Sequence, residues 1–231
     1  MTVTTSTRTA PRETQLARLG LAAGIVGAGV FVVVDLVDAL LRPDYSVLRH
    51  WVSHRALGDW GWVGVASLVV TALLLLVHGA TTWTLPREAR NPSAYSVALV
   101  VAGAALLVAA LFRVDPSLGY PPGVAEPAAT TFAGRVHGVA GPVFMLALAA
   151  SALFSEPFLK RLGEPPEWAR YSWAAALAVV AFLVLTAVVA AADLSGAQWA
   201  RWSGAAQRVA CYVGLCWMAA VAARTMRSTA G

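Results

Sequence analysis

The sequence LGLAAGIVGAGVFVVVDLVDALL, residues 19–41, is a long apolar run that carries only two charges, Asp35 and Asp38. An α-helix rises about 1.5 Å per residue, so this stretch is long enough to cross a hydrocarbon core about 30 Å thick. It is too long for the apolar part of a signal peptide, and no small-residue cleavage site leads from it into a soluble domain. We therefore interpret it as a retained membrane helix.

Five further apolar runs of the same kind follow. Hydrophobic residues make up 58% of the 231 residues and charged residues only 13%, against about 25% charged residues in a soluble domain. We predict an all-α polytopic membrane protein: a single six-helix transmembrane domain over 15–227, after a disordered polar tail over 1–14. The predicted spans are 16–41, 60–84, 93–112, 131–154, 170–192 and 205–223.

Some helix ends can be read directly. Asn91-Pro92-Ser93 is typical of a helix start, and Thr130-Thr131 is typical of an N-cap for the fourth helix. Gly134 and Gly138 lie four residues apart, a spacing that lets a neighbouring helix approach closely. No internal repeat is found.

The net charge of +5 indicates topology rather than nucleic-acid binding, because the basic residues are scattered among short loops with no basic patch. Ten of the 17 lysines and arginines lie on the side of the N-terminus. This bias predicts a plasma-membrane protein with both termini in the cytoplasm. Cys211 and Cys216 share the last span at a spacing that predicts no disulfide.

Ionisable residues gather on the opposite, non-cytoplasmic side. An unpaired charge at the edge of the hydrocarbon is unfavourable by several kcal/mol, so residues at the same depth on five helices are expected to face one another. We predict a polar pocket that opens to this side. The residues are Asp35, Asp38 and Arg42 on the first helix, Arg113 and Asp115 after the third, Arg135 and His137 on the fourth, Asp193 on the fifth, and Gln207 and Arg208 on the sixth.

The connection RHWVSHRALGDWGW, residues 49–62, is unusually polar and aromatic for this chain. Around it, residues 45–57 show helical spacing with one apolar and one polar face, which predicts a short amphipathic helix in the membrane interface that covers the pocket. Trp51, Trp60 and Trp62 suit the headgroup belt. The predicted polar face carries Ser46, Arg49, His50, Ser53 and His54.

Three segments carry a resemblance to a known family: YSVLRHWVSHRALGDWGWVGVASLVV, LFRVDPS followed by TFAGRVHGVAGPVF, and GAAQRVACYVGLCW. They resemble the bacterial and archaeal six-helix membrane family catalogued as domain of unknown function 998, over nearly the whole chain. The resemblance implies the six-helix fold and no particular activity. The residues that match the family's pattern are Arg49, Ser53, Gly58, Gly61, Trp62, Asp115, Gly134, His137 and Arg208; His50 and His54 lie outside it.

Each candidate group has a functional and a structural interpretation. His137 is either a base, proton relay or headgroup ligand, or a histidine that ties two helices together. Asp35 and Asp38 either share a proton or cation, or neutralise Arg42 and another buried arginine, which we favour. His50 and His54, with His137, form only a weak metal motif, so no metal and no cofactor are expected. Ser53 lacks the signature of a nucleophile.

The leading hypothesis is recognition of an anionic lipid or isoprenoid headgroup, with membrane lipids as partners and no nucleic acid. Arg49, Arg135 and Arg208 would hold the anion, unless they reach out to lipid headgroups as Arg113 also could. An enzyme acting on such a lipid is the alternative, with His137, Asp115 and Ser53 as catalytic candidates. A proton-coupled transporter and a purely structural membrane partner are further alternatives. The predicted ligand-binding residues are Arg49, Ser53, Asp115, Arg135, His137, Arg208, Asp35 and Asp38.

Overall fold

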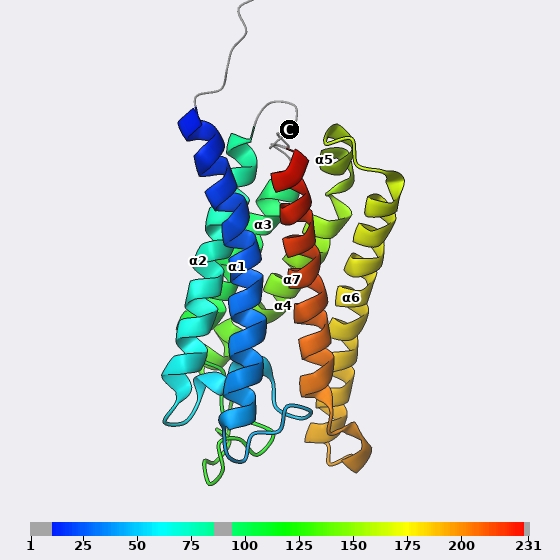
Figure 1. Cartoon of the computed structure of the whole chain (residues 1–231). Helices are drawn as coiled ribbons and strands as arrows, with labels where there is room; N and C mark the ends of the chain where they lie inside the picture. Colours follow the sequence, from blue (N-terminus) through cyan, green and yellow to red (C-terminus); the bar gives the residue numbers. More distant parts are fainter. Residues whose placement is uncertain (1–10, 86–93, 229–231) are drawn as a thin grey trace, which may run out of the picture.

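The computed structural model describes residues 11–85 and 94–228, with side chains for 15–83, 85 and 94–228. Within these ranges the chain is a helical bundle without a β-strand (Figure 1). The long helices are α1 (Pro11–Leu41), α2 (Gly61–Thr84), α3 (Ala94–Leu111), α4 (Phe132–Leu153), α6 (Pro166–Leu194) and α7 (Ser203–Ser228). Three short helices are η1 (Val52–Ala56), α5 (Glu156–Arg161) and η2 (Gln198–Ala200).

All six long helices belong to segments long and apolar enough to cross a membrane, so the predicted all-α six-helix architecture is confirmed. The predicted ends shift slightly. Helix α1 begins at Pro11, inside the segment predicted as a disordered tail, and residues 1–10 lie outside the described residues. The predicted helix start at Asn91-Pro92-Ser93 also lies outside them. The Thr131 N-cap is confirmed, because its hydroxyl accepts a hydrogen bond of 3.0 Å from the Gly134 amide.

The helices pack in chain order and then close the bundle. Helix α1 packs against α2, α2 packs against α3, and α3 packs against α4. Helix α4 packs against α6 and α7, and α7 packs against α1. The beginning of α1 and the end of α7 lie at the same end of the bundle (Figure 1). We call the opposite end, which carries residues 42–60, 112–131 and 195–202, the loop end.

Close packing of α1 on α2 depends on glycine. A Cβ on Gly24 would lie 2.7 Å from the ring of His78, and a Cβ on Gly20 would meet Thr81 at 1.8 Å. His78 Nδ1 lies 3.3 Å from the Gly20 carbonyl oxygen. This buried histidine therefore contributes to the α1–α2 contact, a use of small residues and interhelical hydrogen bonds that is typical of membrane helices.

The predicted amphipathic helix over 45–57 is wrong. Residues 42–60, which we call the inserted loop, form turns and a single short 3₁₀ helix, η1. Every residue of η1 is buried, so the segment enters the bundle instead of lying flat on its surface. Trp60 and Trp62 are exposed as expected for a headgroup belt, whereas Trp51 turns inward and stacks on His54 with ring centroids 5.0 Å apart.

Glycines on two helices allow this insertion. A Cβ on Gly64 would lie 2.5 Å from the Arg55 carbonyl oxygen, and a Cβ on Gly61 would lie 2.5 Å from that of Ala56. On α7, a Cβ on Gly204 would lie 2.3 Å from the His50 carbonyl oxygen. The loop backbone therefore contacts helix backbone directly. Of the predicted polar face, His50, Ser53 and His54 are buried, Arg49 is partly buried against Asp193, and Ser46 is exposed.

Candidate functional site

A cluster of five buried charged side chains lies at the loop end of the bundle. Asp35 and Asp38 come from α1, Arg42 follows the end of α1, Arg55 comes from η1, and Arg208 comes from α7. Spacings of three and four residues place both carboxylates and Arg42 on one side of the helical path. We call these five residues the charge cluster.

Each carboxylate of the charge cluster contacts two guanidinium groups. Asp38 accepts hydrogen bonds from Arg42 Nε at 2.8 Å and from Arg55 Nη1 at 3.0 Å. Asp35 accepts hydrogen bonds from Arg208 Nε at 3.0 Å and from the Tyr212 hydroxyl. Arg55 Nε lies 2.7 Å from Asp35 Oδ1, but its N–H is poorly aligned with that oxygen, so the contact is ionic. The cluster thus joins α1, α7 and the inserted loop.

The charge cluster contains three positive and two negative groups, a surplus of one positive charge. Backbone oxygens partly offset it. Arg42 donates to the carbonyl oxygens of Leu57 at 3.0 Å and Trp60 at 2.6 Å, and Arg208 donates to those of Val47 and His50, both at 2.8 Å. The sequence interpretation favoured a pairing of the carboxylates with Arg42 and one other buried arginine; the structure pairs them with Arg42 and with two other buried arginines, Arg55 and Arg208.

The two histidines of the inserted loop are held in neutral tautomers. The Ser46 amide donates to His50 Nδ1 at 3.0 Å, and the Trp51 amide donates to His54 Nδ1 at 3.2 Å. His54 Nε2 therefore carries the proton and donates to the Ser117 hydroxyl at 2.9 Å. Burial lowers the pKa of His54 to about 3 and also lowers the pKa of His50. Since His54 donates to Ser117, it does not act as a base on that hydroxyl.

A second ion pair fastens the inserted loop to α6. Arg49 Nε and Nη2 donate to the two oxygens of Asp193 at 2.6 and 2.9 Å. This bidentate geometry matches the guanidinium fork to a carboxylate. Arg49 is thereby engaged within the protein, and the Asp193 side chain is almost fully buried.

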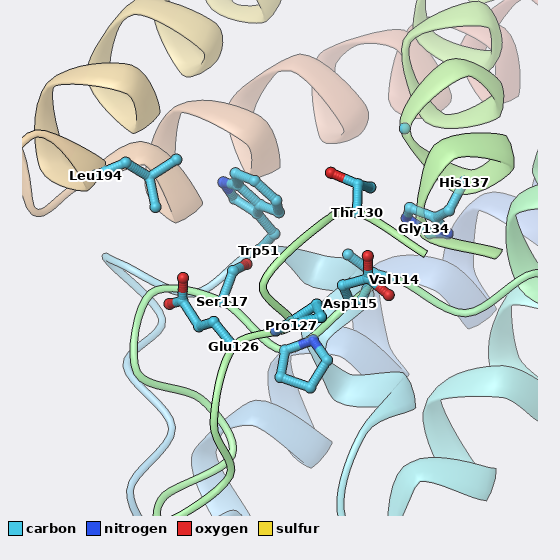
Figure 2. A pocket seen from close by; sticks show the side chains of 12 residues that line it. Trp51, Val114, Asp115, Ser117, Glu126, Pro127, Thr130, Gly134, His137 and Leu194 are labelled. Atoms are coloured by element: carbon cyan, nitrogen blue, oxygen red, sulfur yellow. The ribbon is translucent and has the colours of Figure 1, made fainter. Parts of the chain in front are cut away.

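A pocket of about 280 Å³ opens at the loop end, between the 114–130 loop and the first turns of α4 (Figure 2). Trp51 and Leu194 form one side, and Asp115, Thr130 and His137 lie on the other (Figure 2). None of the twelve described residues that line it is a lysine or arginine. They are Trp51, Val114, Asp115, Pro116, Ser117, Glu126, Pro127, Thr130, Gly134, His137, Gly138 and Leu194. We call this the loop-end pocket.

His137 connects the loop-end pocket to the α3–α4 contact. Its Nδ1 lies 2.8 Å from the carbonyl oxygen of Ala109 and 2.9 Å from that of Phe112, at the end of α3. Carbonyl oxygens only accept, so Nδ1 carries a proton and the neutral ring keeps a lone pair at Nε2. The contacts with α3 thus use Nδ1 of His137, as the structural interpretation expected. Nε2 keeps a lone pair that can accept a hydrogen bond.

Asp115 caps α4 from outside the helix. Its carboxylate accepts hydrogen bonds from the Thr131 amide at 2.9 Å and the Thr131 hydroxyl at 2.6 Å. A Cβ on Gly134 would lie 2.1 Å from Asp115 Oδ2, so the glycine at this position lets the carboxylate reach the helix start. A carboxylate at a helix N-terminus also meets the positive end of the helix dipole.

The remaining predicted residues do not join into one site. Arg135 is exposed, and its Nη1 donates to the Thr130 carbonyl oxygen at 2.9 Å, at the rim of the loop-end pocket. Arg113 is exposed. Ser53 lies beside a separate cavity of about 40 Å³ that His137 and Gln207 also line. The expectation that the ionisable groups of five helices face one another is met only for the charge cluster and the Arg49–Asp193 pair.

A metal site is not formed by the described residues, since they contain no group of three or more His, Cys, Asp or Glu side chains placed to hold an ion. The Nδ1 atoms of His50 and His54 both accept backbone N–H groups. The two rings are therefore oriented by the inserted loop itself.

Sequence reasoning missed Arg55 and Tyr45. Arg55 is fully buried, and the Tyr45 hydroxyl accepts from Arg208 Nη2 at 2.5 Å and donates to the Trp51 carbonyl oxygen at 2.8 Å. A signal for Arg55 existed: two aspartates within a membrane span need more positive partners than Arg42 alone. The sequence gives no such signal for Tyr45, because a tyrosine is equally expected on the apolar face of an interfacial helix.

Six helices long and apolar enough to cross a membrane, with the buried charged groups of the loop end paired inside the bundle, indicate a multi-pass integral membrane protein. Within that class, the chain belongs to the family described as Protein of unknown function (DUF998), whose model matches residues 25–224. The match agrees with the resemblance found in the sequence. The comparison with curated proteins and the comparison with solved structures each found no match.

Proposed function

We propose that this protein recognises an amphipathic membrane molecule by its headgroup, in the loop-end pocket. The observation that carries the proposal is the mixed lining of that pocket: Asp115, Glu126 and His137 offer acceptors beside the apolar surfaces of Trp51 and Leu194. Ligand sites typically combine an apolar wall with a few converging polar groups. The pocket lies where the membrane-length helices end, which is the depth of a lipid headgroup.

The lining favours a headgroup that donates hydrogen bonds, such as a hydroxyl or amine. Two carboxylates and the Nε2 lone pair of His137 accept, while Arg49 and Arg208, expected to hold an anion, are paired with Asp193 and Asp35. Arg135 is the arginine nearest to this role, because it bonds to Thr130 at the pocket rim. An anionic group of the ligand would therefore meet Arg135, with the donors of the headgroup below it.

An enzyme acting on the same molecule is the second candidate. His137 supports it, because the proton on Nδ1 leaves Nε2 as the basic nitrogen in a residue that lines the pocket. Neither Asp35 nor Asp38 lines the loop-end pocket, and both are ion-paired, which gives no support to a proton-coupled transporter. We further propose that the loop end faces away from the cytoplasm of a plasma-membrane protein, on the bias of lysine and arginine toward the other end.

The test is to extract the protein with its surrounding lipid in polymer nanodiscs and identify the retained lipids by mass spectrometry. Glu126→Gln is the first variant, because Glu126 is exposed and substitutions at exposed positions usually change stability by no more than about 0.5 kcal/mol. His137→Gln is the second, and Glu167→Gln, at the other end of the bundle, is the matched control. We expect one lipid class, enriched in the wild type, to fall about tenfold in both pocket variants, the change that follows from losing one charged hydrogen bond.

Arg135→Gln separates the headgroup chemistries. If the ligand carries an anion, this variant loses the same lipid; if the headgroup is only hydroxylated or aminated, it does not. Lipid profiles that are identical in the wild type, Glu126→Gln and His137→Gln proteins would contradict the proposed function.

A further inference from the structure

A second concave surface is lined by residues of the loop-end part of α1, the start of the inserted loop, and Trp60 and Val63 at the start of α2. It is a groove of about 600 Å³ with an aliphatic wall and a charged floor made by Asp38 and Arg42. We call it the α1–α2 groove. The residues of its wall are Val33, Val34, Val37, Leu41, Trp60 and Val63.

The groove faces the position of lipid in a membrane. The apolar span of α1 ends at Leu41, so Arg42 lies where hydrocarbon gives way to headgroups. Val33 lies eight residues before Leu41, about 12 Å deeper along the helix. Trp60, which is 62% exposed, stands at the same end as Arg42, as expected for an aromatic residue of the headgroup belt. The groove therefore runs from headgroup depth into the depth of lipid chains.

The floor of the groove pairs Asp38 with Arg42, but the charge cluster to which both belong has an unbalanced positive charge. The charge cluster carries one more guanidinium than carboxylate, and Arg42 is the only one of its three arginines that lines the groove. Arg42 donates to four acceptors among the described residues, with one bond from Nη2, to Trp60. Nη2 has two N–H groups, so one donor is left for a ligand.

We propose that the α1–α2 groove binds an anionic membrane lipid, with a phosphate oxygen on Arg42 and one hydrocarbon chain along the wall from Leu41 to Val33. Burial of a net positive charge is unfavourable in a medium of low dielectric constant, and a lipid phosphate supplies the missing negative charge at the depth where the lipid already lies. This site is separate from the loop-end pocket and does not depend on the proposed function.

The experiment places the full-length protein in nanodiscs of equal parts phosphatidylglycerol and phosphatidylcholine and measures the lipids retained by native mass spectrometry. One basic group near the membrane surface contributes about 1 kcal/mol toward an anionic lipid, which corresponds to about fivefold preference for phosphatidylglycerol in the wild type. Val37→Trp fills the groove. Val26→Trp is the matched control, since both valines are 52% exposed on the same helix and Val26 does not line the groove.

We expect Val37→Trp to abolish the preference for phosphatidylglycerol and Val26→Trp to keep it. Leu41→Trp, at a 77% exposed position of the same wall, repeats the test if Val37→Trp lowers the thermal stability. Equal retention of the two lipids by the wild type, or a preference unchanged in both groove variants, would overturn the proposal. Glu126→Gln tests the loop-end pocket and Val37→Trp tests the α1–α2 groove, so a negative result for one site leaves the result for the other unchanged.

Discussion

Replacing Asp35 with asparagine tests the charge cluster most severely. Asp35 is fully buried, and Asp35→Asn keeps its shape while it removes the negative charge that faces Arg55 and Arg208. The cluster then changes from a surplus of one positive charge to a surplus of two, and the asparagine amide brings donors toward donors. Breaking a buried ion pair by removing one partner is unfavourable by about 3–5 kcal/mol, and here two pairs and the Tyr212 hydrogen bond change together.

The assay is an SDS-driven unfolding titration in mixed micelles, with Glu167→Gln as control. Glu167 pairs with Arg170 at 2.6 Å on the exposed surface, where ion pairs contribute little, so its loss should be barely measurable. Arg55→Met removes one of the three positive charges, so the double variant Asp35→Asn/Arg55→Met returns to a surplus of one positive charge, as in the wild type. It should therefore be more stable than the sum of the single effects predicts. Additive effects, or an Asp35→Asn variant as stable as Glu167→Gln, would contradict this prediction.

Three further predictions concern the inserted loop and the topology. His54 has a pKa of about 3 when folded and about 6.5 when unfolded, so the folded state binds fewer protons between these values, and stability should fall by up to about 1.4 kcal/mol per pH unit as the pH drops from about 6.5. His54→Gln should flatten the pH profile of the unfolding midpoint. An unchanged slope would count against a buried neutral His54. Gly64→Ala should destabilise the protein by about 1–3 kcal/mol in the SDS unfolding titration, because the added Cβ would meet the Arg55 carbonyl oxygen. Gly138→Ala is the control and should have little effect, because the space around its Cβ is open. Equal stability of the two variants would argue against the close contact of Gly64 with the inserted loop. In a background without Cys211 and Cys216, a membrane-impermeant thiol reagent should label Ser195→Cys but not Glu167→Cys in intact cells, and the opposite pattern would reverse the proposed orientation.

The sequence predicts the membrane spans well because the physical constraint behind them is strong. A helix that crosses the hydrocarbon needs about 20 apolar residues whatever its neighbours are, so the six runs map onto α1 to α4, α6 and α7. The Thr131 cap is equally local, since the hydroxyl and the amide that it accepts from are three residues apart.

The inserted loop was mispredicted for a tertiary reason. Its helical spacing is real, but its position depends on contacts between distant segments. Arg55 pairs with Asp35 and Asp38 on α1. The loop backbone can approach α2 and α7 closely because these helices have glycines at the contact, Gly61, Gly64 and Gly204. An amphipathic pattern shows that one face is polar; it does not show whether that face meets water or buried carboxylates.

The candidate site was half predictable. Asp115 and His137 do line a pocket at the loop end, because Asp115 follows α3 and His137 lies in the first turns of α4, at the same end of the bundle. The expected anion site of Arg49, Arg135 and Arg208 is not formed, because Arg49 is paired with Asp193 and Arg208 with Asp35. These pairs depend on how α1, α6 and α7 pack, which the sequence pattern does not show.

A cryo-electron microscopy map of the protein in nanodiscs made from its own membrane would test directly whether the loop-end pocket holds a lipid. We expect ordered density in the loop-end pocket between Trp51 and His137, continuous with a hydrocarbon chain in the adjoining bilayer. A map in which the 114–130 loop closes on α4 and leaves no space between those two residues would contradict it.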